Sequence, residues 1–129
     1  MTLIESIGKK ARFLEAVTAA SGLAPRLRVA HARAEDLAQG GGVRFDLITA
    51  RAIAPLGELI RLAAPILTPT GSLFAWKRAG EGWDAELSSA ASFIGSSAIE
   101  GISVNVAALA GALLVRVTPH ESERVRPRV

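Results

Sequence analysis

The sequence predicts an α/β fold built on a mostly parallel sheet with helices on both faces. With 129 residues, half of them hydrophobic, the chain is long enough to bury a core and is not a disordered chain. Short apolar stretches typical of strands alternate with segments of helical periodicity, which is the pattern of a parallel sheet covered by helices. Charged residues follow several of these strands, where open α/β sheets bind their ligands.

The first half of the chain alternates predicted strands with predicted helices. Residues 3–4 end a buried strand with Glu5 at its tip, and Ser6 is placed to cap the helix that follows. The face of this helix that we expect to be buried carries Ile7, Ala11, Leu14, Val17 and Ala20, and Gly22 ends the helix.

Two further strands are predicted before the middle of the chain. They cover residues 27–30 and 45–49, and a short helical turn at residues 34–38 lies between them. The run Gly40-Gly41-Gly42 resembles a phosphate-binding loop, but a strand follows it where such a site needs a helix N-terminus. An ordinary loop is therefore the favoured interpretation.

The second half begins with a helix. Pro55 suits its first turn, and the helix should run to about residue 67 with these residues inward: Leu56, Leu59, Ile60, Ala63 and Ile66. Residues 68–71 predict a turn, and residues 72–76 predict a strand that places Trp76 in the core. The remaining predictions are a helix at residues 81–94, an antiparallel strand pair at residues 102–106 and 112–118, and a basic, solvated tail at residues 119–129.

Composition limits the possible functions. The 15 Lys and Arg exceed the 12 Asp and Glu by three, a mild excess that permits a nucleic-acid partner without requiring one. The absence of cysteine excludes disulfides, thiolate zinc sites and cysteine nucleophiles, and no metal site is predicted. The N-terminal residues lack a secretory signal, and no apolar run approaches the ~20 residues of a membrane span. We therefore expect a cytoplasmic protein without a membrane partner.

The charged groups at the predicted strand tips are the candidate ligand contacts. Glu5 could accept hydrogen bonds from ribose hydroxyls, although a single acid is a weak signal. Arg51 follows a buried strand and needs an anionic partner, which could be a ligand or, alternatively, Glu35. Lys9, Lys10 and Lys77 could contact phosphates or form a solvated face.

Three segments together resemble the 16S ribosomal RNA guanine-N7 methyltransferase family, the glucose-inhibited division protein B family. The first is Leu3-Ile-Glu-Ser-Ile-Gly-Lys-Lys-Ala-Arg-Phe-Leu14, and the second is Ala32-Arg-Ala-Glu35. The third begins Phe45-Asp-Leu-Ile-Thr-Ala-Arg-Ala-Ile-Ala-Pro-Leu56 and continues from Pro65 to Lys77. The resemblance is specific over residues 3–77 and loose beyond them.

The resemblance implies a Rossmann-like class I methyltransferase fold over residues 1–118, with S-adenosylmethionine as methyl donor. The acceptor would be a guanine of 16S ribosomal RNA, free or in the small ribosomal subunit. Glu5 would hold the cofactor ribose, Ala34 and Glu35 would flank the adenine, and Arg51 would close the cofactor pocket. The residues expected to face RNA are Lys9, Lys10, Arg33, Lys77 and Arg78.

The chain departs from the family pattern in several places. Glu5 stands where Asp is usual, and Arg78 stands where Gly is usual. The first strand of the family and its glycine-rich cofactor loop have no counterpart in the sequence. That strand would lie between the strands at residues 3–4 and 45–49, so we expect a fragment that is marginally stable or self-associating and binds the cofactor weakly.

Two other functions remain open from the sequence alone. The chain could be a non-catalytic RNA-binding fragment, or it could be half of another dinucleotide-binding enzyme, such as a dehydrogenase with Glu5 as its ribose acid. The Arg33-Ala34-Glu35 and Ala50-Arg51-Ala52 blocks have no role in dehydrogenase chemistry, which favours the methyltransferase.

Overall fold

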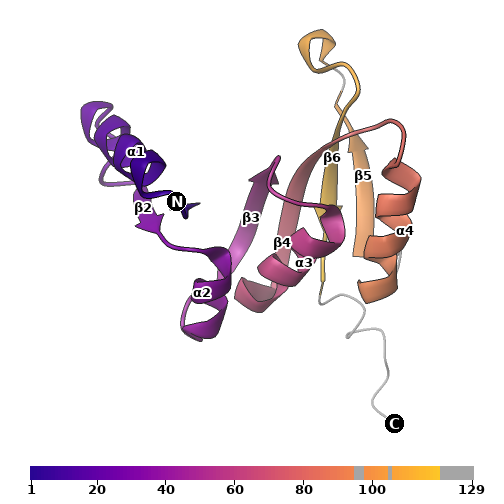
Figure 1. Cartoon of the computed structure of the whole chain (residues 1–129), viewed down its shortest axis with the longest axis horizontal. Helices are drawn as coiled ribbons and strands as arrows, with labels where there is room; N and C mark the ends of the chain where they lie inside the picture. The colour runs from indigo at the N-terminus through magenta and orange to yellow at the C-terminus, as the bar shows by residue number, and fades with distance from the viewer. Residues whose placement is uncertain (95–97, 105, 120–129) are drawn as a thin grey trace. The chain divides into compact units, whose positions relative to one another are not determined.

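The computed structural model describes residues 1–94, 98–104 and 106–119, and these form two compact units (Figure 1). Unit 1 comprises Met1–Val43 and unit 2 begins at Arg44. Nearly all of the predicted basic tail, residues 120–129, lies outside the described residues.

Unit 1 contains a pair of parallel strands, β1 (Thr2–Glu5) and β2 (Arg28–His31), connected through helix α1 (Gly8–Ala20). Leu3 lies opposite Val29 and Glu5 lies opposite His31 in this pair. The short helix α2 (Ala34–Gln39) follows β2. The predicted strand–helix–strand order of this region is therefore confirmed.

Helix α1 begins and packs differently from the prediction. Its N-cap residue is Ile7, with no side-chain cap, so Ser6 lies outside the helix and the predicted serine cap is wrong. The Glu5 carboxylate instead accepts a hydrogen bond from the Ile7 amide. The buried residues are Ala11 and Thr18, whereas Ile7 and Val17, which we predicted to face inward, are 51% and 44% exposed. A pair of strands is too narrow to cover the whole apolar side of the helix.

Unit 2 is built on a four-stranded sheet in the order β3-β4-β6-β5. Strand β3 (Phe45–Arg51) pairs in parallel with β4 (Leu67–Arg78), and β6 (Ala112–Val117) runs antiparallel to both β4 and β5. The predicted antiparallel pair at the end of the chain is confirmed. Strand β5 spans Ile99–Ser103, so its predicted position at residues 102–106 was displaced.

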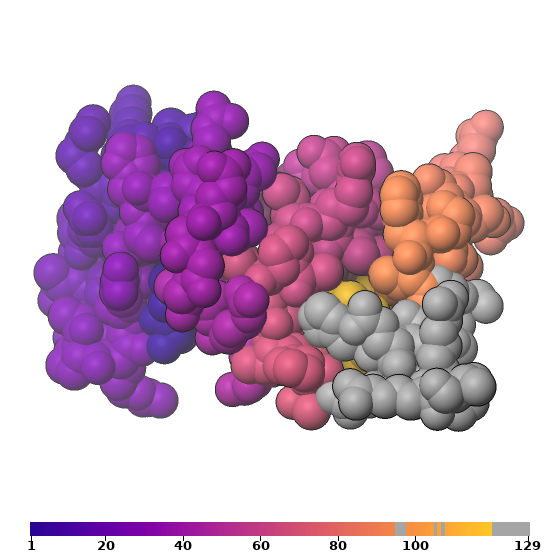
Figure 2. Space-filling view, turned by 90° about the horizontal axis from the view of Figure 1, so that it is seen from below, coloured from indigo at the N-terminus to yellow at the C-terminus, as the bar shows by residue number. Residues whose placement is uncertain are grey.

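Helices α3 (Leu56–Ala63) and α4 (Trp83–Ile94) lie side by side on one face of this sheet (Figure 1). In the space-filling view their atoms, rose and orange, adjoin each other (Figure 2). A 3₁₀ turn (Ala64–Ile66) extends α3, and another (Ala107–Leu109) precedes β6. The predicted inward face of α3 is confirmed, since Leu56, Leu59, Ile60, Ala63 and Ile66 are all buried. The first four of these pack in one cluster with sheet residues such as Leu73, Ala75, Val115 and Val117. Complete burial of a leucine or valine contributes about 1.5 to 3 kcal/mol.

The predicted turn at residues 68–71 is wrong, because these residues belong to β4. The pairing with β3 passes from Phe45–Leu67 to Leu47–Ser72, so β4 accommodates additional residues in a bulge. The Thr68 hydroxyl donates to Asp46 (3.0 Å), and the Arg44 guanidinium donates to the Pro65 carbonyl. Pro and Gly in this segment therefore mark a bulge within a strand.

The sheet face opposite α3 and α4 is partly apolar and exposed. Strand residues alternate between the two faces of the sheet. Ile48 and Ala75 belong to the core face, so their neighbours Leu47 and Trp76 point to the other face. Leu47 is 57% exposed and Trp76 is 36% exposed. The prediction that Trp76 lies in the core is therefore wrong, because the two helices of unit 2 cover the other face.

The strand pairing agrees with the expectation that β1 and β3 lack a common neighbour. Among the described residues, β1 pairs with β2 alone and β3 with β4 alone. The described helices include none that is long and apolar enough to cross a membrane.

We predict that Gly71→Ala lowers the free energy of unfolding by about 1 to 3 kcal/mol, the usual cost of overpacking. A methyl group there would lie 2.9 Å from both the Phe45 carbonyl oxygen and Leu67 Cδ2. Urea denaturation measures the change. Gly101→Ala is the control in the same sheet, since its methyl would meet Leu113 at 3.6 Å, an ordinary contact. Equal stability of both variants would contradict the bulge packing.

Candidate functional site

The carboxyl ends of β1 and β2 place Glu5 beside His31. One oxygen of the half-buried Glu5 carboxylate, Oε1, accepts the Ile7 amide (2.8 Å), and His31 Nε2 lies 3.3 Å from the Ser6 carbonyl. In the described part of unit 1, the other carboxylate oxygen, Oε2, has no hydrogen-bond partner. This tip of the sheet can therefore accept a hydrogen bond from a ligand hydroxyl, as predicted for a ribose.

The Arg33-Ala34-Glu35 segment forms the start of α2. Arg33 is the N-cap residue and Ala34 the first helical residue, and the helix has no side-chain cap. Glu35 and Asp36 occupy the first turn, where carboxylates are stabilised by the helix dipole. Arg33 and Glu35 are exposed and Ala34 is half-buried. The segment begins two residues after the end of β2, and it belongs to the same unit as Glu5.

Arg51 is the last residue of β3 and is exposed. It lies opposite Trp76 in the strand pairing and on the sheet face away from α3 and α4. The next residue, Ala52, has φ +52°, and no other described non-glycine residue has a positive φ. A left-handed alanine costs about 1 to 2 kcal/mol, so the chain turns under strain directly after Arg51. Glu35, its alternative partner, lies in the other unit.

The environment of Lys77 differs from the one we predicted, in which its side chain faces RNA. Its ammonium group lies inside unit 2, with the side chain 13% exposed, and forms an ion pair with Glu86 of α4 (2.6 Å). The ammonium also donates a hydrogen bond to the Ala54 carbonyl (2.7 Å). Alternation along β4 explains the difference: Lys77 shares the covered face with Ala75, whereas Trp76 and Arg78 point to the other face.

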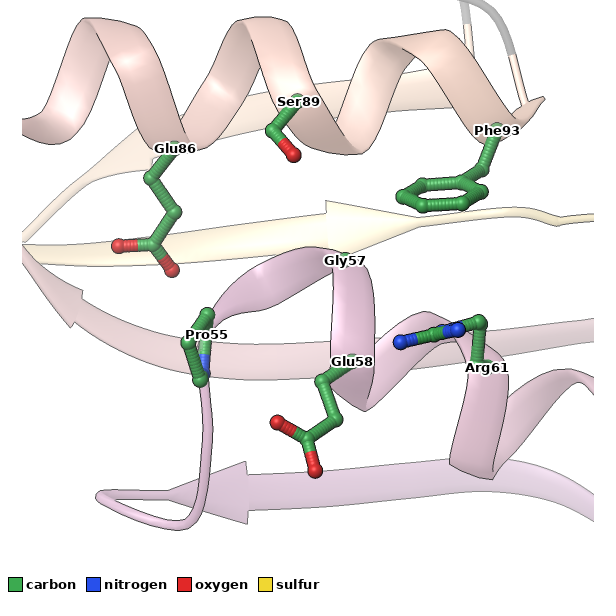
Figure 3. A pocket seen from close by; sticks show the side chains of 7 residues that line it. All are labelled: Pro55, Gly57, Glu58, Arg61, Glu86, Ser89 and Phe93. Carbon is green, nitrogen blue, oxygen red and sulfur yellow. The ribbon is translucent and has the colours of Figure 1, made fainter.

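A pocket of about 430 Å³ lies between α3 and α4 (Figure 3). Figure 3 shows the Glu86 carboxylate extending from α4 toward Pro55, and the Phe93 ring near Arg61. The Arg61 guanidinium carbon is 5.5 Å from the centre of that ring, a cation–π distance. Gly57 permits this close approach, because a methyl group there would lie 3.1 Å from the Phe93 ring.

The remaining predicted RNA contacts lie on the surface. Lys9 and Lys10 are exposed on the first turn of α1, and Arg78 is exposed at the end of β4. Sequence reasoning missed Glu86 and the left-handed Ala52. No sequence signal identifies them, because the contact of Glu86 with the Leu56 amide joins residues thirty positions apart and alanine rarely adopts a positive φ.

Comparison with known proteins gives a family match. A family model described as rRNA small subunit methyltransferase G matches residues 1–109. The ribosomal RNA small subunit methyltransferase G of Leptothrix cholodnii is 38% identical over 104 residues, which are 81% of this chain and 45% of that protein. The Salinispora tropica protein of the same name is 40% identical over 83 residues, 61% of this chain and 34% of that protein. The chain thus spans less than half the length of these relatives.

Solved structures show the same fold. Human methyltransferase-like protein 13 in complex with SAH superposes with a TM-score of 0.63 at 16% identity, covering 99% of this chain and 72% of that one. A precorrin 8W decarboxylase from Methanobacterium thermoautotrophicum has a TM-score of 0.62 at 14% identity, covering 90% and 68%. At such identities the likeness concerns the fold alone, which is that of the class I methyltransferases.

We predict that Ala52→Gly raises the free energy of unfolding by about 1 kcal/mol, because glycine adopts a positive φ without strain. Thermal denaturation followed by circular dichroism measures it. Ala79→Gly, at an exposed position of negative φ, is the control and should lower stability by about 0.5 kcal/mol. A loss of stability in both variants would show that the turn after Arg51 carries no strain.

Proposed function

The chain belongs to the rRNA small subunit methyltransferase G family, and on that premise we propose that it is part of a cytoplasmic enzyme that methylates guanine N7 of 16S ribosomal RNA. S-adenosylmethionine would be the methyl donor. The observation that carries the proposal is the position of Glu5, of Arg33-Ala34-Glu35 and of Arg51. Glu5 and Arg51 are the last residues of parallel strands and Arg33 follows the end of another, where open α/β sheets bind cofactors.

The residues of unit 1 suit the adenosine part of this cofactor. Glu5 has one carboxylate oxygen bonded to the Ile7 amide, and the other is available to accept from a ribose hydroxyl. The Ile7 bond also orients the carboxylate toward the end of the strand. Ala34 has a small side chain at the start of α2 and would leave room for a flat base beside Glu35.

The chemistry asks little of the protein beyond positioning. Bound S-adenosylmethionine supplies an electrophilic methyl group. Guanine N7 carries a free lone pair and loses no proton when it reacts, so no general base or covalent nucleophile is needed. The chain's residues would then act by holding both reactants in line, with Arg51, at the end of β3, as the proposed cofactor contact of unit 2.

The exposed cations are the proposed contacts to RNA. Lys9 and Lys10 on α1 together with Arg33 supply positive charge within unit 1, and Arg78 supplies it in unit 2. Such groups bind phosphates without reading sequence, so they would position the RNA while other contacts select the guanine. We leave Lys77 out of this set because its ammonium is engaged with Glu86 and Ala54.

We predict that S-adenosylhomocysteine binds the purified chain and that Glu5→Ala, Glu35→Ala and Arg51→Ala each weaken binding about tenfold. That factor corresponds to the loss of one hydrogen bond to a charged group. Isothermal titration calorimetry measures the dissociation constants. The matched controls are Glu15→Ala and Arg26→Ala, which remove exposed charges of unit 1 and should leave affinity unchanged.

A folded chain that binds no S-adenosylhomocysteine would contradict the cofactor site in this chain. If it then bound RNA, the function would be that of a non-catalytic RNA-binding fragment. Preferential binding of NAD would indicate a dehydrogenase fragment.

For the RNA surface, we predict that Lys9→Ala, Lys10→Ala and Arg33→Ala each reduce the salt dependence of binding to a 16S ribosomal RNA fragment. The slope of log affinity against log salt concentration should fall by about 0.7 to 0.9 for each phosphate contact removed. Fluorescence anisotropy at several salt concentrations measures the slope. Lys77→Met should leave it unchanged, and an equal effect of that variant would restore Lys77 to the RNA surface.

A further inference from the structure

Helix α3 is capped by a side chain from α4. Its N-cap residue is Pro55, which makes no side-chain cap hydrogen bond. The first helical amide, that of Leu56, instead donates to Glu86 Oε1 at 2.6 Å, across thirty residues of sequence. The same oxygen lies 2.6 Å from Lys77 Nζ, which in turn donates to the Ala54 carbonyl at 2.7 Å.

These contacts hold both sides of Pro55. The carbonyl before it is bound by Lys77, and the amide after it is bound by Glu86. The two side chains bind each other and are only 13% and 28% exposed. Because Lys77 comes from β4 and Glu86 from α4, the sheet and the second helix together fix the end of the loop at residues 52–55.

We propose that the Lys77–Glu86 pair is a positioning device for Arg51. The loop at residues 52–55 begins directly after Arg51 with the left-handed Ala52. The pair fixes the other end of this loop, at Pro55. Four residues separate Arg51 from Leu56, so movement at Pro55 changes the direction in which the chain leaves β3. Lys77 and Arg51 point to different faces of the sheet. The pair can therefore act on Arg51 through the loop, without touching the cofactor.

The strain at Ala52 supports this inference. A left-handed alanine persists only where its surroundings hold it, and the pair supplies two hydrogen bonds and an ion pair within a few residues. An ion pair that is mostly removed from water also has little freedom to exchange partners. Loss of either side chain should therefore release the loop while leaving the hydrophobic core of α3 in place.

The role toward the cofactor rests on the proposed function, so the test separates the loop from the ligand. Hydrogen exchange of the full chain without ligand reports the loop directly. We expect Lys77→Met and Glu86→Gln to speed exchange of the amides of residues 52–54 and 56 about tenfold, with β6 amides unchanged. Glu58→Gln is the matched control: Glu58 lines the same pocket, but the Leu56 amide donates to Glu86 and not to Glu58.

Affinity for S-adenosylhomocysteine is the second readout. Both variants should weaken it about tenfold, the double variant should be no worse than either single one because the residues act as a unit, and Lys77→Arg should restore part of it. Loop exchange equal to that of the unaltered chain, or affinity losses matched by Glu58→Gln, would overturn the proposal. Failure of the unaltered chain to bind S-adenosylhomocysteine would overturn the proposed function, and loop exchange alone would then decide whether the pair positions the loop.

Discussion

The packing of α3 against β3, β4 and β6 is the constraint on which the rest of unit 2 depends. Leu56 and Val115 are completely buried at this contact, and burial there fixes the height and rotation of α3 over the sheet. Once α3 is placed, its first amide faces α4, and Glu86 can cap it. The hydrophobic contact thus determines where the polar contacts form, because apolar burial supplies the larger free energy and the polar groups then need partners.

The Lys77–Glu86 pair shows how a charge can mislead when it is read from the sequence. A lysine at the end of a strand, followed by arginine, is typical of a phosphate contact. Because side chains alternate along β4, Lys77 points inward. There its ammonium group binds the Glu86 carboxylate and the Ala54 carbonyl. Arg78, one residue later, stays on the surface. The pleat of the strand therefore separates two adjacent cations into a structural one and a candidate RNA contact.

The two units share a feature that bears on stability. Among the described residues, each sheet has an edge strand that is paired on one side alone, β1 in unit 1 and β3 in unit 2. Exposed apolar residues such as Phe13 on α1 and Leu47 on β3 accompany these strands. Unpaired strand edges and exposed apolar surface favour association, so concentration should be controlled in measurements on the chain.

The sequence by itself determined the order of strands and helices and the inward face of α3. It also placed Glu5, Arg33 to Glu35 and Arg51 at or just after the ends of strands. These features follow from local periodicity and from short segments that members of one family share. Tertiary structure alone decided the bulge in β4, the exposure of Trp76, the left-handed turn at Ala52 and the partners of Lys77. The bulge and one partner of Lys77 involve groups far apart in the chain: a side chain at position 71 would lie 2.9 Å from the Phe45 carbonyl oxygen, and the Lys77 ammonium binds the Ala54 carbonyl 23 residues away. Local sequence cannot specify such contacts, because they exist only once the core has brought the elements together.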